Sequence, residues 1–177
     1  MSTRILVTYA SRTGSTAGIA EAIGKSLYEG GAEVDVLAME NVKDLASYQA
    51  VVAGSAIQAA QWLPEAMQFI QAHRAALKSK PFAVFMVCMT LAMKIGGNRR
   101  GDYRQQVAAW LDPVCAIVRP VSKGLFPGVL DTRKIPSLGD RLKFRLSVKL
   151  GIWSEGDHRD WNAIRTWAES LRPLLLQ

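Results

Sequence analysis

The sequence of 177 residues has little cysteine and no apolar run long enough to cross a bilayer. Its two cysteines, Cys88 and Cys115, lie far apart in apolar segments, which indicates buried free thiols rather than a disulfide framework or a metal site. The longest apolar run, residues 82–93, is interrupted only by Thr90 and is shorter than the roughly 20 residues that span a membrane. Seven prolines and no low-complexity tract argue against disorder, and the length suits one domain.

Acidic residues are outnumbered by basic ones. The sequence holds 15 Asp and Glu against 22 Lys and Arg, a formal net charge of +7. This excess predicts an anionic partner, and we expect a small molecule or a surface rather than a nucleic acid. The N-terminus lacks the pattern of a secretory signal, so we expect a cytoplasmic protein, with the inner face of the membrane as one place where its positive charge could hold it.

Strand-like and helix-like segments alternate along the chain. The predicted strands are residues 4–10, 32–39, 49–57, 82–89 and 117–124. The predicted helices are residues 17–28, 42–48, 64–78, 103–116 and 161–171. Five strands that alternate with helices predict an α/β fold, a parallel sheet with helices on both faces, in a single domain over residues 1–177.

One long stretch, residues 125–160, breaks this alternation where a compact α/β domain normally has a short connection. Its apolar residues alternate as in a strand and also keep the four-residue spacing of a helix, so its secondary structure stays open. The stretch carries six basic residues, namely Arg133, Lys134, Arg141, Lys143, Arg145 and Lys149. We expect them to contact a substrate or a membrane surface, and the alternative is a solvated basic flap.

A short polar loop separates the first strand from the first helix. It consists of Ser11, Arg12, Thr13, Gly14, Ser15 and Thr16. At this position backbone N–H groups and the helix N-terminus can converge on a phosphate, and the hydroxyl groups can add donors. The loop lacks the ending of a Walker A loop and the three spaced glycines of a dinucleotide fingerprint, which disfavours nucleoside triphosphates and NAD.

In this loop the chain resembles the flavodoxin family, whose pattern [ST]-x-T-G-x-T is filled by Ser11, Thr13, Gly14 and Thr16. The resemblance implies a flavodoxin-like three-layer sandwich with a five-stranded parallel sheet in the order 2-1-3-4-5. It also implies one non-covalently bound FMN. A basic insertion after the fifth strand is then an addition to the family fold.

The same resemblance predicts where the flavin ring lies, because ligands of such sheets bind at the carboxyl ends of the strands. The expected contacts are Ser55, Ala56, Ile57, Trp62, Cys88, Met89, Thr90, Leu91 and Tyr103. Either aromatic ring, Trp62 or Tyr103, could stack on the flavin. The loop of residues 55–63 departs from the family because it contains no glycine, the residue that lets a peptide flip beside the flavin.

The insertion carries a second resemblance, to the menaquinone-dependent protoporphyrinogen oxidase (dehydrogenase) family. Its matching segments are residues 126–128, 130–134, 140–141, 145–146, Lys149 and, before the last helix, 160–161. This resemblance implies an FMN-dependent oxidoreductase of porphyrin and heme biosynthesis that passes electrons from a porphyrinogen to a membrane quinone. The basic residues would then suit propionate groups.

No nucleophile triad or pair of catalytic carboxylates is evident, so any chemistry belongs to the flavin and no catalytic side chain is proposed. Two alternatives stay open beside the enzyme. One is a flavodoxin-type electron carrier that exchanges electrons with a redox protein partner and transforms no small molecule. The other is an FMN domain that serves another flavin reductase reaction.

Overall fold

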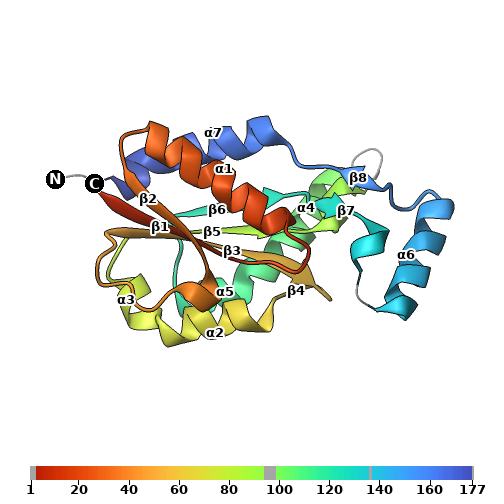
Figure 1. The fold of residues 1–177 in the computed structure, drawn as a ribbon, viewed down its shortest axis with the longest axis horizontal. Coiled ribbons are helices and arrows are strands. Elements are labelled where there is room, and N and C mark those ends of the chain that lie inside the picture. Colours follow the sequence, from red (N-terminus) through yellow and green to blue (C-terminus); the bar gives the residue numbers. More distant parts are fainter. Residues whose placement is uncertain (1–2, 94–98, 136, 177) are drawn as a thin grey trace.

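The computed structural model describes residues 3–93, 99–135 and 137–176 (Figure 1). The strands are β1 (Arg4–Ala10), β2 (Glu33–Ala38), β3 (Ala50–Gln58), β4 (Gln61–Trp62), β5 (Phe82–Val87), β6 (Ser122–Phe126), β7 (Val129–Leu130) and β8 (Gly156–Asp157). The α-helices are α1 (Ser15–Glu29), α2 (Pro64–Ala72), α3 (Arg74–Lys78), α4 (Arg99–Ala108), α5 (Asp112–Ile117), α6 (Leu138–Lys149) and α7 (Trp161–Leu175). Single 3₁₀ turns are η1 (Met39–Asn41), η2 (Met89–Ala92), η3 (Ala109–Leu111) and η4 (Thr132–Lys134).

The main sheet has the strand order β2-β1-β3-β5-β6, and every neighbour pair along this path is parallel. This confirms the predicted order 2-1-3-4-5, because the two-residue β4 lies off the path as an antiparallel partner of β3. The chain passes from β1 to β2 on one side and then to β3 on the other. The order therefore reverses beside β1, which is the position where such sheets bind ligands.

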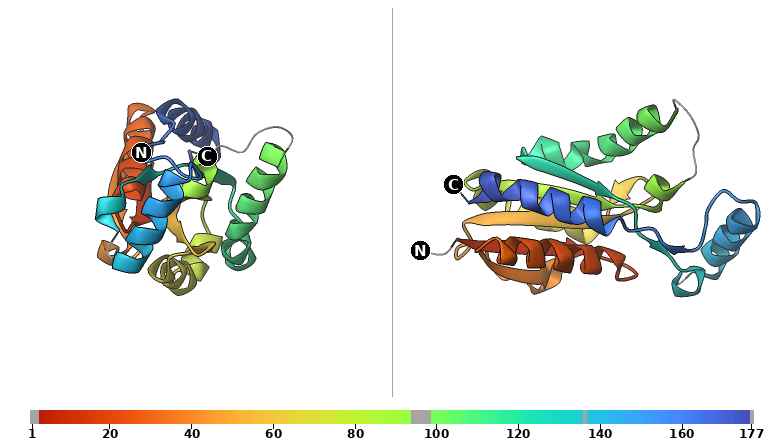
Figure 2. Two further views of the ribbon diagram at one scale, coloured as in Figure 1. Left: turned by 90° about the vertical axis from the view of Figure 1, so that its right-hand side faces the viewer. Right: turned by 90° about the horizontal axis from the view of Figure 1, so that it is seen from above.

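Helices cover both faces of the sheet (Figures 1 and 2). Helices α1 and α7 pack on one face, where the core includes Ile19, Ile23, Phe85 and Ile164. The other face is covered by the helices from α2 to α5, over a core that includes Phe82. Strand β5 is completely buried, which explains why its sequence is apolar without alternation. The three-layer sandwich is confirmed.

The predicted helix at residues 42–48 is wrong. The 3₁₀ turn η1 ends at Asn41, and the segment after it is irregular up to β3. Its backbone polar groups find partners other than a helical ladder. The Lys80 ammonium donates to the carbonyls of Leu45 (2.6 Å) and Tyr48 (2.8 Å), and the Asp44 carboxylate accepts from the N–H of Ala46.

The predicted strand at residues 117–124 is shifted towards the C-terminus. Ile117 ends helix α5, and the N–H of Val118 still donates to the carbonyl of Val114. Sheet pairing starts only after Pro120, where the N–H of Val121 donates to the carbonyl of Phe82 (2.7 Å). Proline cannot donate to a ladder, so it fixes this boundary. The last strand thus extends to Phe126, into the predicted insertion.

The insertion forms a small unit beyond the carboxyl ends of the strands (Figures 1 and 2). It contains the two-stranded sheet β7–β8, the turn η4 and helix α6, which settles the open choice between strand and helix at residues 138–149. Ser137 caps α6 by accepting from the N–H of Asp140. Among the described residues no helix is both long enough and apolar enough to cross a bilayer.

Candidate functional site

The polar loop after β1 forms an open cradle of backbone donors. Gly14 is the N-cap of α1 and has a φ of 90°, a left-handed conformation that glycine adopts without strain. The Ser11 hydroxyl accepts from the N–H of Gly14 (3.0 Å) and holds the turn closed. No described side chain caps this helix, so the N–H groups of its first turn stay free for an anion.

Two of the hydroxyl groups lie at this cradle in different environments. Thr16 is fully buried, and its hydroxyl has no hydrogen-bond partner among the described residues. Thr13 is exposed at the tip of the loop. A buried hydroxyl without a partner is unfavourable by itself, because its desolvation is not compensated. Together with the free N–H groups, this donor set fits the phosphate of a monoester.

The side chain of Arg12 is paired with an acidic residue of α2. Its guanidinium group donates to both carboxylate oxygens of Glu65, at 2.6 and 3.1 Å, in the first turn of α2. Both side chains are about half exposed, so this ion pair adds little to stability. In this conformation Arg12 contributes its backbone to the loop and not its charge.

The loop after β3 is a tight hairpin. Residues Ala59 and Ala60 connect β3 to β4 and both have positive φ, 50° and 61°, although neither is glycine. The Ser55 hydroxyl accepts from the N–H of Leu63 (3.1 Å) and donates to the carbonyl of Ala56 (2.8 Å), so it holds the hairpin and is not free for a ligand. The glycine that the flavodoxin pattern has in this loop is absent, yet Ala59 and Ala60 adopt left-handed backbone conformations.

The two candidate stacking rings differ in accessibility. Trp62 is only 4% exposed and belongs to the core cluster on one face of the sheet, so its ring is poorly accessible to a flavin, and its stacking stays a prediction. Tyr103 is partly buried, and its hydroxyl donates to the sulfur of Met93 (3.3 Å). Ala56 and Ile57 at the end of β3 are also partly accessible. Tyr103 is therefore the better candidate for stacking, which stays a prediction.

The loop after β5 lies at the same edge of the sheet. Cys88 is 5% exposed, and burial raises the pKa of its thiol to about 11, so it stays protonated and unreactive at neutral pH. Met89, Thr90 and Leu91 lie in the turn η2 and are partly accessible. The predicted loop runs on to Tyr103, but residues 94–98 lie outside the described part of the chain.

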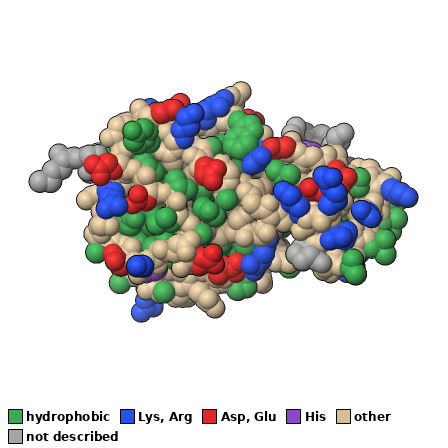
Figure 3. All heavy atoms as spheres, in the orientation of Figure 1, with side chains coloured by type: hydrophobic (Ala, Val, Ile, Leu, Met, Phe, Trp, Pro, Cys, Tyr) green, Lys and Arg blue, Asp and Glu red, His purple; other side chains and the backbone are tan. Residues whose placement is uncertain are grey.

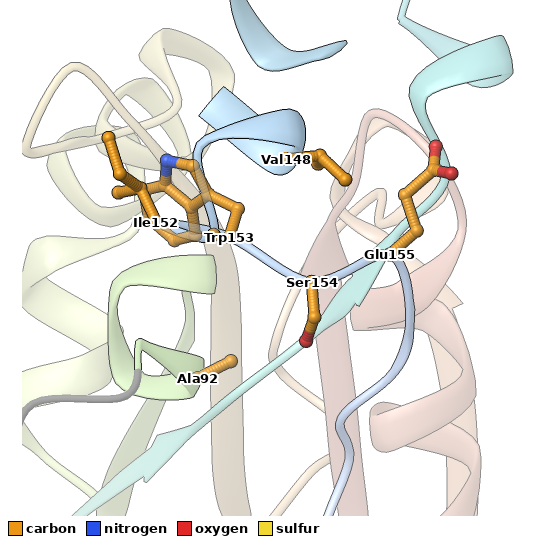
Figure 4. Close-up of a pocket in the computed structure, with 7 residues that line it drawn as sticks. Ala92, Val148, Ile152, Trp153, Ser154 and Glu155 are labelled. Carbon is orange, nitrogen blue, oxygen red and sulfur yellow. The ribbon is translucent and has the colours of Figure 1, made fainter. Parts of the chain in front are cut away.

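Two hollows are lined by residues of the insertion, one of them beside this edge of the sheet and the other within the insertion itself. A cavity of about 270 Å³ lies between Ala92 of η2 and the segment after α6, where Ile152 and Trp153 approach Ala92 (Figure 4). A larger groove of about 1010 Å³ runs between α6 and the β7–β8 sheet. Three of the six basic residues of the insertion line the groove, namely Arg133, Arg145 and Lys149.

The other three basic residues of the insertion are placed differently. Arg141 donates to the carbonyl of Ile135 at 2.9 and 3.2 Å, and thereby closes the start of α6. Lys143 is exposed and lies 3.7 Å from the carboxylate of Asp140. Lys134 ends the turn η4 and is exposed. Of the six predicted basic residues, three therefore line one groove and the other three lie outside its lining.

Sequence reasoning missed Arg159, which lies against the first turn of α1. A Cβ atom on Gly18 would be 2.7 Å from the Arg159 guanidinium, so glycine allows this approach. The guanidinium donates to both carboxylate oxygens of Asp157, at 2.8 and 2.6 Å, and this pairing lowers the pKa of the Asp157 carboxyl. The same guanidinium lies 4.4 Å from the centre of the Trp161 ring. The sequence signal was Gly18, a small residue in the first turn of the helix that follows the polar loop.

The described residues contain no group of three or more His, Cys, Asp and Glu side chains arranged to hold a metal ion. Fold and cradle together define a doubly wound α/β protein whose switch point is shaped for a phosphorylated ligand. The chain belongs to the flavodoxin domain family, whose model matches residues 6–158. Among curated proteins no sequence matches this chain significantly.

Solved structures of flavodoxins share this fold at low sequence identity. A short-chain flavodoxin associated with a PDU bacterial microcompartment has a TM-score of 0.58 and 15% identity, and the match covers 97% of each chain. The flavodoxin of Streptococcus pneumoniae TIGR4 has a TM-score of 0.55 and 15% identity, over 96% of this chain and 98% of that one. Oxidised flavodoxin 2 of Bacillus cereus has a TM-score of 0.51 and 22% identity, over 84% and 99%.

Proposed function

We propose that this chain binds one FMN non-covalently and acts as an electron-transfer flavoprotein. The observation that carries the proposal is the cradle at residues 11–16, where free N–H groups of α1 and the buried, unpartnered hydroxyl of Thr16 converge at the switch point of a flavodoxin-type sheet. Membership in the flavodoxin domain family supports the same cofactor and the same role.

Each element of the site has a distinct part in this proposal. The N-terminus of α1, with Thr13 and Thr16, would bind the phosphate, because several donors and the helix dipole favour an anion there. Backbone groups of Ala56, Ile57, Thr90 and Leu91 would contact the edge of the ring. Tyr103 would cover one of its faces. Bound FMN supplies the ability to accept and release electrons, and the protein positions it and sets its electrostatic surroundings.

The charge of the protein bears on its role. Flavodoxins that are strongly acidic disfavour the anionic reduced flavin, whereas a chain with a net charge of +7 stabilises it and raises the reduction potential. A basic surface also favours an acidic redox partner, because complementary charge speeds association. We therefore expect a carrier of higher potential than an acidic flavodoxin.

Cofactor identity tests the proposal directly. Protein purified in native form should be yellow and release FMN, not riboflavin or FAD, on denaturation, as chromatography with fluorescence detection would show.

Thr13→Ala should weaken FMN binding about ten- to a hundredfold and leave the weak binding of riboflavin unchanged, because it removes only a phosphate donor. Ser79→Ala, at the opposite end of the sheet, is the matched control. Equal affinity of wild type and Thr13→Ala for FMN would remove this side chain from the site, and a colourless protein that fails to take up FMN would refute the proposal.

A second function is favoured by the groove beside α6, whose lining combines Arg133, Arg145 and Lys149 with Leu130, Leu142 and Leu146. Cations and apolar side chains together suit a largely apolar substrate that carries carboxylates, which is the chemistry of a porphyrinogen. The smaller cavity lies between η2 and the insertion, beside the expected position of the flavin ring. We propose protoporphyrinogen oxidation with a quinone acceptor, a step of heme biosynthesis, as the alternative to the carrier.

An anaerobic assay separates the two functions. The FMN-loaded protein would be mixed with protoporphyrinogen and a soluble quinone, and porphyrin fluorescence would be followed against the autoxidation blank. The enzyme predicts turnover that falls about tenfold or more when Arg133→Gln removes a cation from the groove, while Lys25→Gln on α1 has no effect. Fluorescence no faster than the blank, with FMN fully bound, would exclude the enzyme and leave the carrier.

A further inference from the structure

Helix α6 presents a stripe of leucines to solvent. Leu138, Leu142, Leu146 and Leu150 are 78%, 70%, 58% and 67% exposed, and a spacing of four residues places them along one side of a helix. Of the eight large apolar side chains that are exposed in the described part of the chain, five lie between residues 138 and 152. Such a concentration of exposed apolar surface marks an interaction site.

Cations flank this stripe. Arg145 and Lys149 lie at helical positions on one border of the leucines, and Lys143 lies on the other. Within residues 3–93, 99–135 and 137–176, the side chains of Arg145 and Lys149 form no ion pair and no hydrogen bond. The only acidic residue of α6 is Asp140. Leucines bordered by basic side chains whose charged ends can reach outward are the pattern of a helix that lies in a membrane interface.

The position of α6 makes this stripe accessible to a flat surface. The helix is the outermost element at one end of the molecule (Figures 1 and 2), and Figure 3 shows basic side chains gathered over that end. Its inner side is anchored, because the ring of Phe144 packs against that of Trp153 at 6.1 Å and Val148 lines the cavity beneath. The leucines are therefore not needed to hold the helix in place.

The length and charge of the stripe distinguish between three kinds of partner: a small molecule, a second copy of the chain and a lipid surface. Leu142 and Leu146 also line the groove, but Leu138 and Leu150 lie outside its lining, so the stripe of about 18 Å is longer than one small-molecule site. A second copy of the chain would bring the Arg145 and Lys149 side chains of both copies together, which like charges disfavour. An anionic lipid surface matches both the leucines and the cations.

We propose that α6 docks on an anionic phospholipid surface, with its leucine stripe buried among the acyl chains and Arg145, Lys149 and Lys143 at the phosphate level. The insertion projects from the carboxyl edge of the sheet, so this edge is the part of the domain nearest the bilayer. The proposal goes beyond electron transfer and does not depend on it. Flavin content is measured separately, so that failure of one proposal does not imply failure of the other.

Co-sedimentation of the full chain with vesicles tests the proposal. The protein should bind vesicles of phosphatidylcholine with phosphatidylglycerol and bind phosphatidylcholine alone much more weakly. The double variant Leu142→Ser and Leu146→Ser should lose about a hundredfold or more in affinity, because each leucine contributes about tenfold or more when buried. Tyr28→Ser, which removes an equally exposed apolar side chain on α1, should bind like wild type.

Charge variants provide a second, independent readout. Arg145→Gln with Lys149→Gln should weaken binding about 25-fold, about fivefold for each residue, and molar salt should remove most of this difference. Lys25→Gln with Lys78→Gln carries the same change of charge on other helices and should bind like wild type. Because all these side chains are exposed, circular dichroism and melting curves should be unchanged.

Three results would overturn the proposal. Wild-type protein could remain in the supernatant at millimolar anionic lipid. The leucine double variant could bind vesicles as well as Tyr28→Ser does. The wild type could run as a dimer that the leucine double variant converts to a monomer, without lipid binding by either, and a second copy would then cover α6.

Discussion

Replacing Thr16 with valine should change stability and cofactor affinity in opposite directions. The Thr16 hydroxyl is fully buried without a partner among the described residues, and such a group is unfavourable by about 1–3 kcal/mol. Valine has nearly the same shape and a similar helix propensity. The cofactor-free variant should therefore unfold at higher urea concentration than the cofactor-free wild type, by about 1–3 kcal/mol.

In the proposed complex with FMN, the same substitution removes a hydroxyl donor to the charged phosphate. Such a hydrogen bond contributes about 1.5–3 kcal/mol, so FMN affinity should fall about ten- to a hundredfold. At an FMN concentration of 100 times the wild-type Kd, binding adds about 2.7 kcal/mol to the wild type but only about 0.4–1.4 kcal/mol to the variant. Excess FMN should therefore remove much or all of the variant's advantage in stability.

Urea unfolding with and without FMN, combined with fluorescence titration, measures both effects. Thr8→Val is the matched control, because Thr8 is also fully buried with an unpartnered hydroxyl but lies within β1 rather than in the cradle. It should stabilise the protein without changing FMN affinity. The reasoning is refuted if Thr16→Val and Thr8→Val have the same FMN affinity as wild type.

Three further substitutions or conditions test the structure. Gly54→Ala should destabilise the protein by about 3 kcal/mol in urea unfolding, because the new Cβ would lie 2.0 Å from the buried ring of Phe85, and a smaller effect than about 1 kcal/mol would show that this packing is wrong. Ala60→Gly should stabilise it by about 0.5–1 kcal/mol, since glycine relieves a φ of 61°, and a loss of stability would contradict the left-handed turn. Hydrogen bonds from the hydroxyl and N–H of Thr132 lower the pKa of Glu155 below its ordinary 4.5. A lowered pKa in the folded state stabilises the internal structure of the insertion above pH 4.5, and this contribution is lost as the pH falls through the shifted pKa. Amide hydrogen exchange at β7 and η4 should therefore speed up in acid, and Thr132→Val should remove that pH dependence.

The sheet could be predicted from the sequence because its signal is local. Strands β1 and β5 read as apolar runs, and a buried parallel strand needs little else. The cradle could also be predicted, since a small polar loop with Gly14 directly follows a strand and precedes an amphipathic helix. Neither inference needed knowledge of distant contacts.

The errors arose where distant residues decide the outcome. Residues 42–48 have an acceptable helical pattern, but the carbonyls of Leu45 and Tyr48 bind the ammonium of Lys80, more than thirty positions away. Burial of Trp62 was equally invisible, because an aromatic residue in a loop has the same sequence signal whether its ring points into the core or out of it. The pattern at 138–150 fits a strand and a helix, and the packing of Phe144 on Trp153 favours the helix.

The place of the insertion follows from its contacts with the cradle. It departs from the sheet at Gly128, where an added Cβ would lie 3.1 Å from the hydroxyl of Ser15, and it returns at Arg159, against Gly18. Both ends therefore rest on the first turn of α1, and each contact is a close approach at a glycine. Since the two ends are held on one helical turn, the insertion leaves the strand order unchanged, and it projects from the edge of the sheet at which the proposed phosphate and flavin contacts lie.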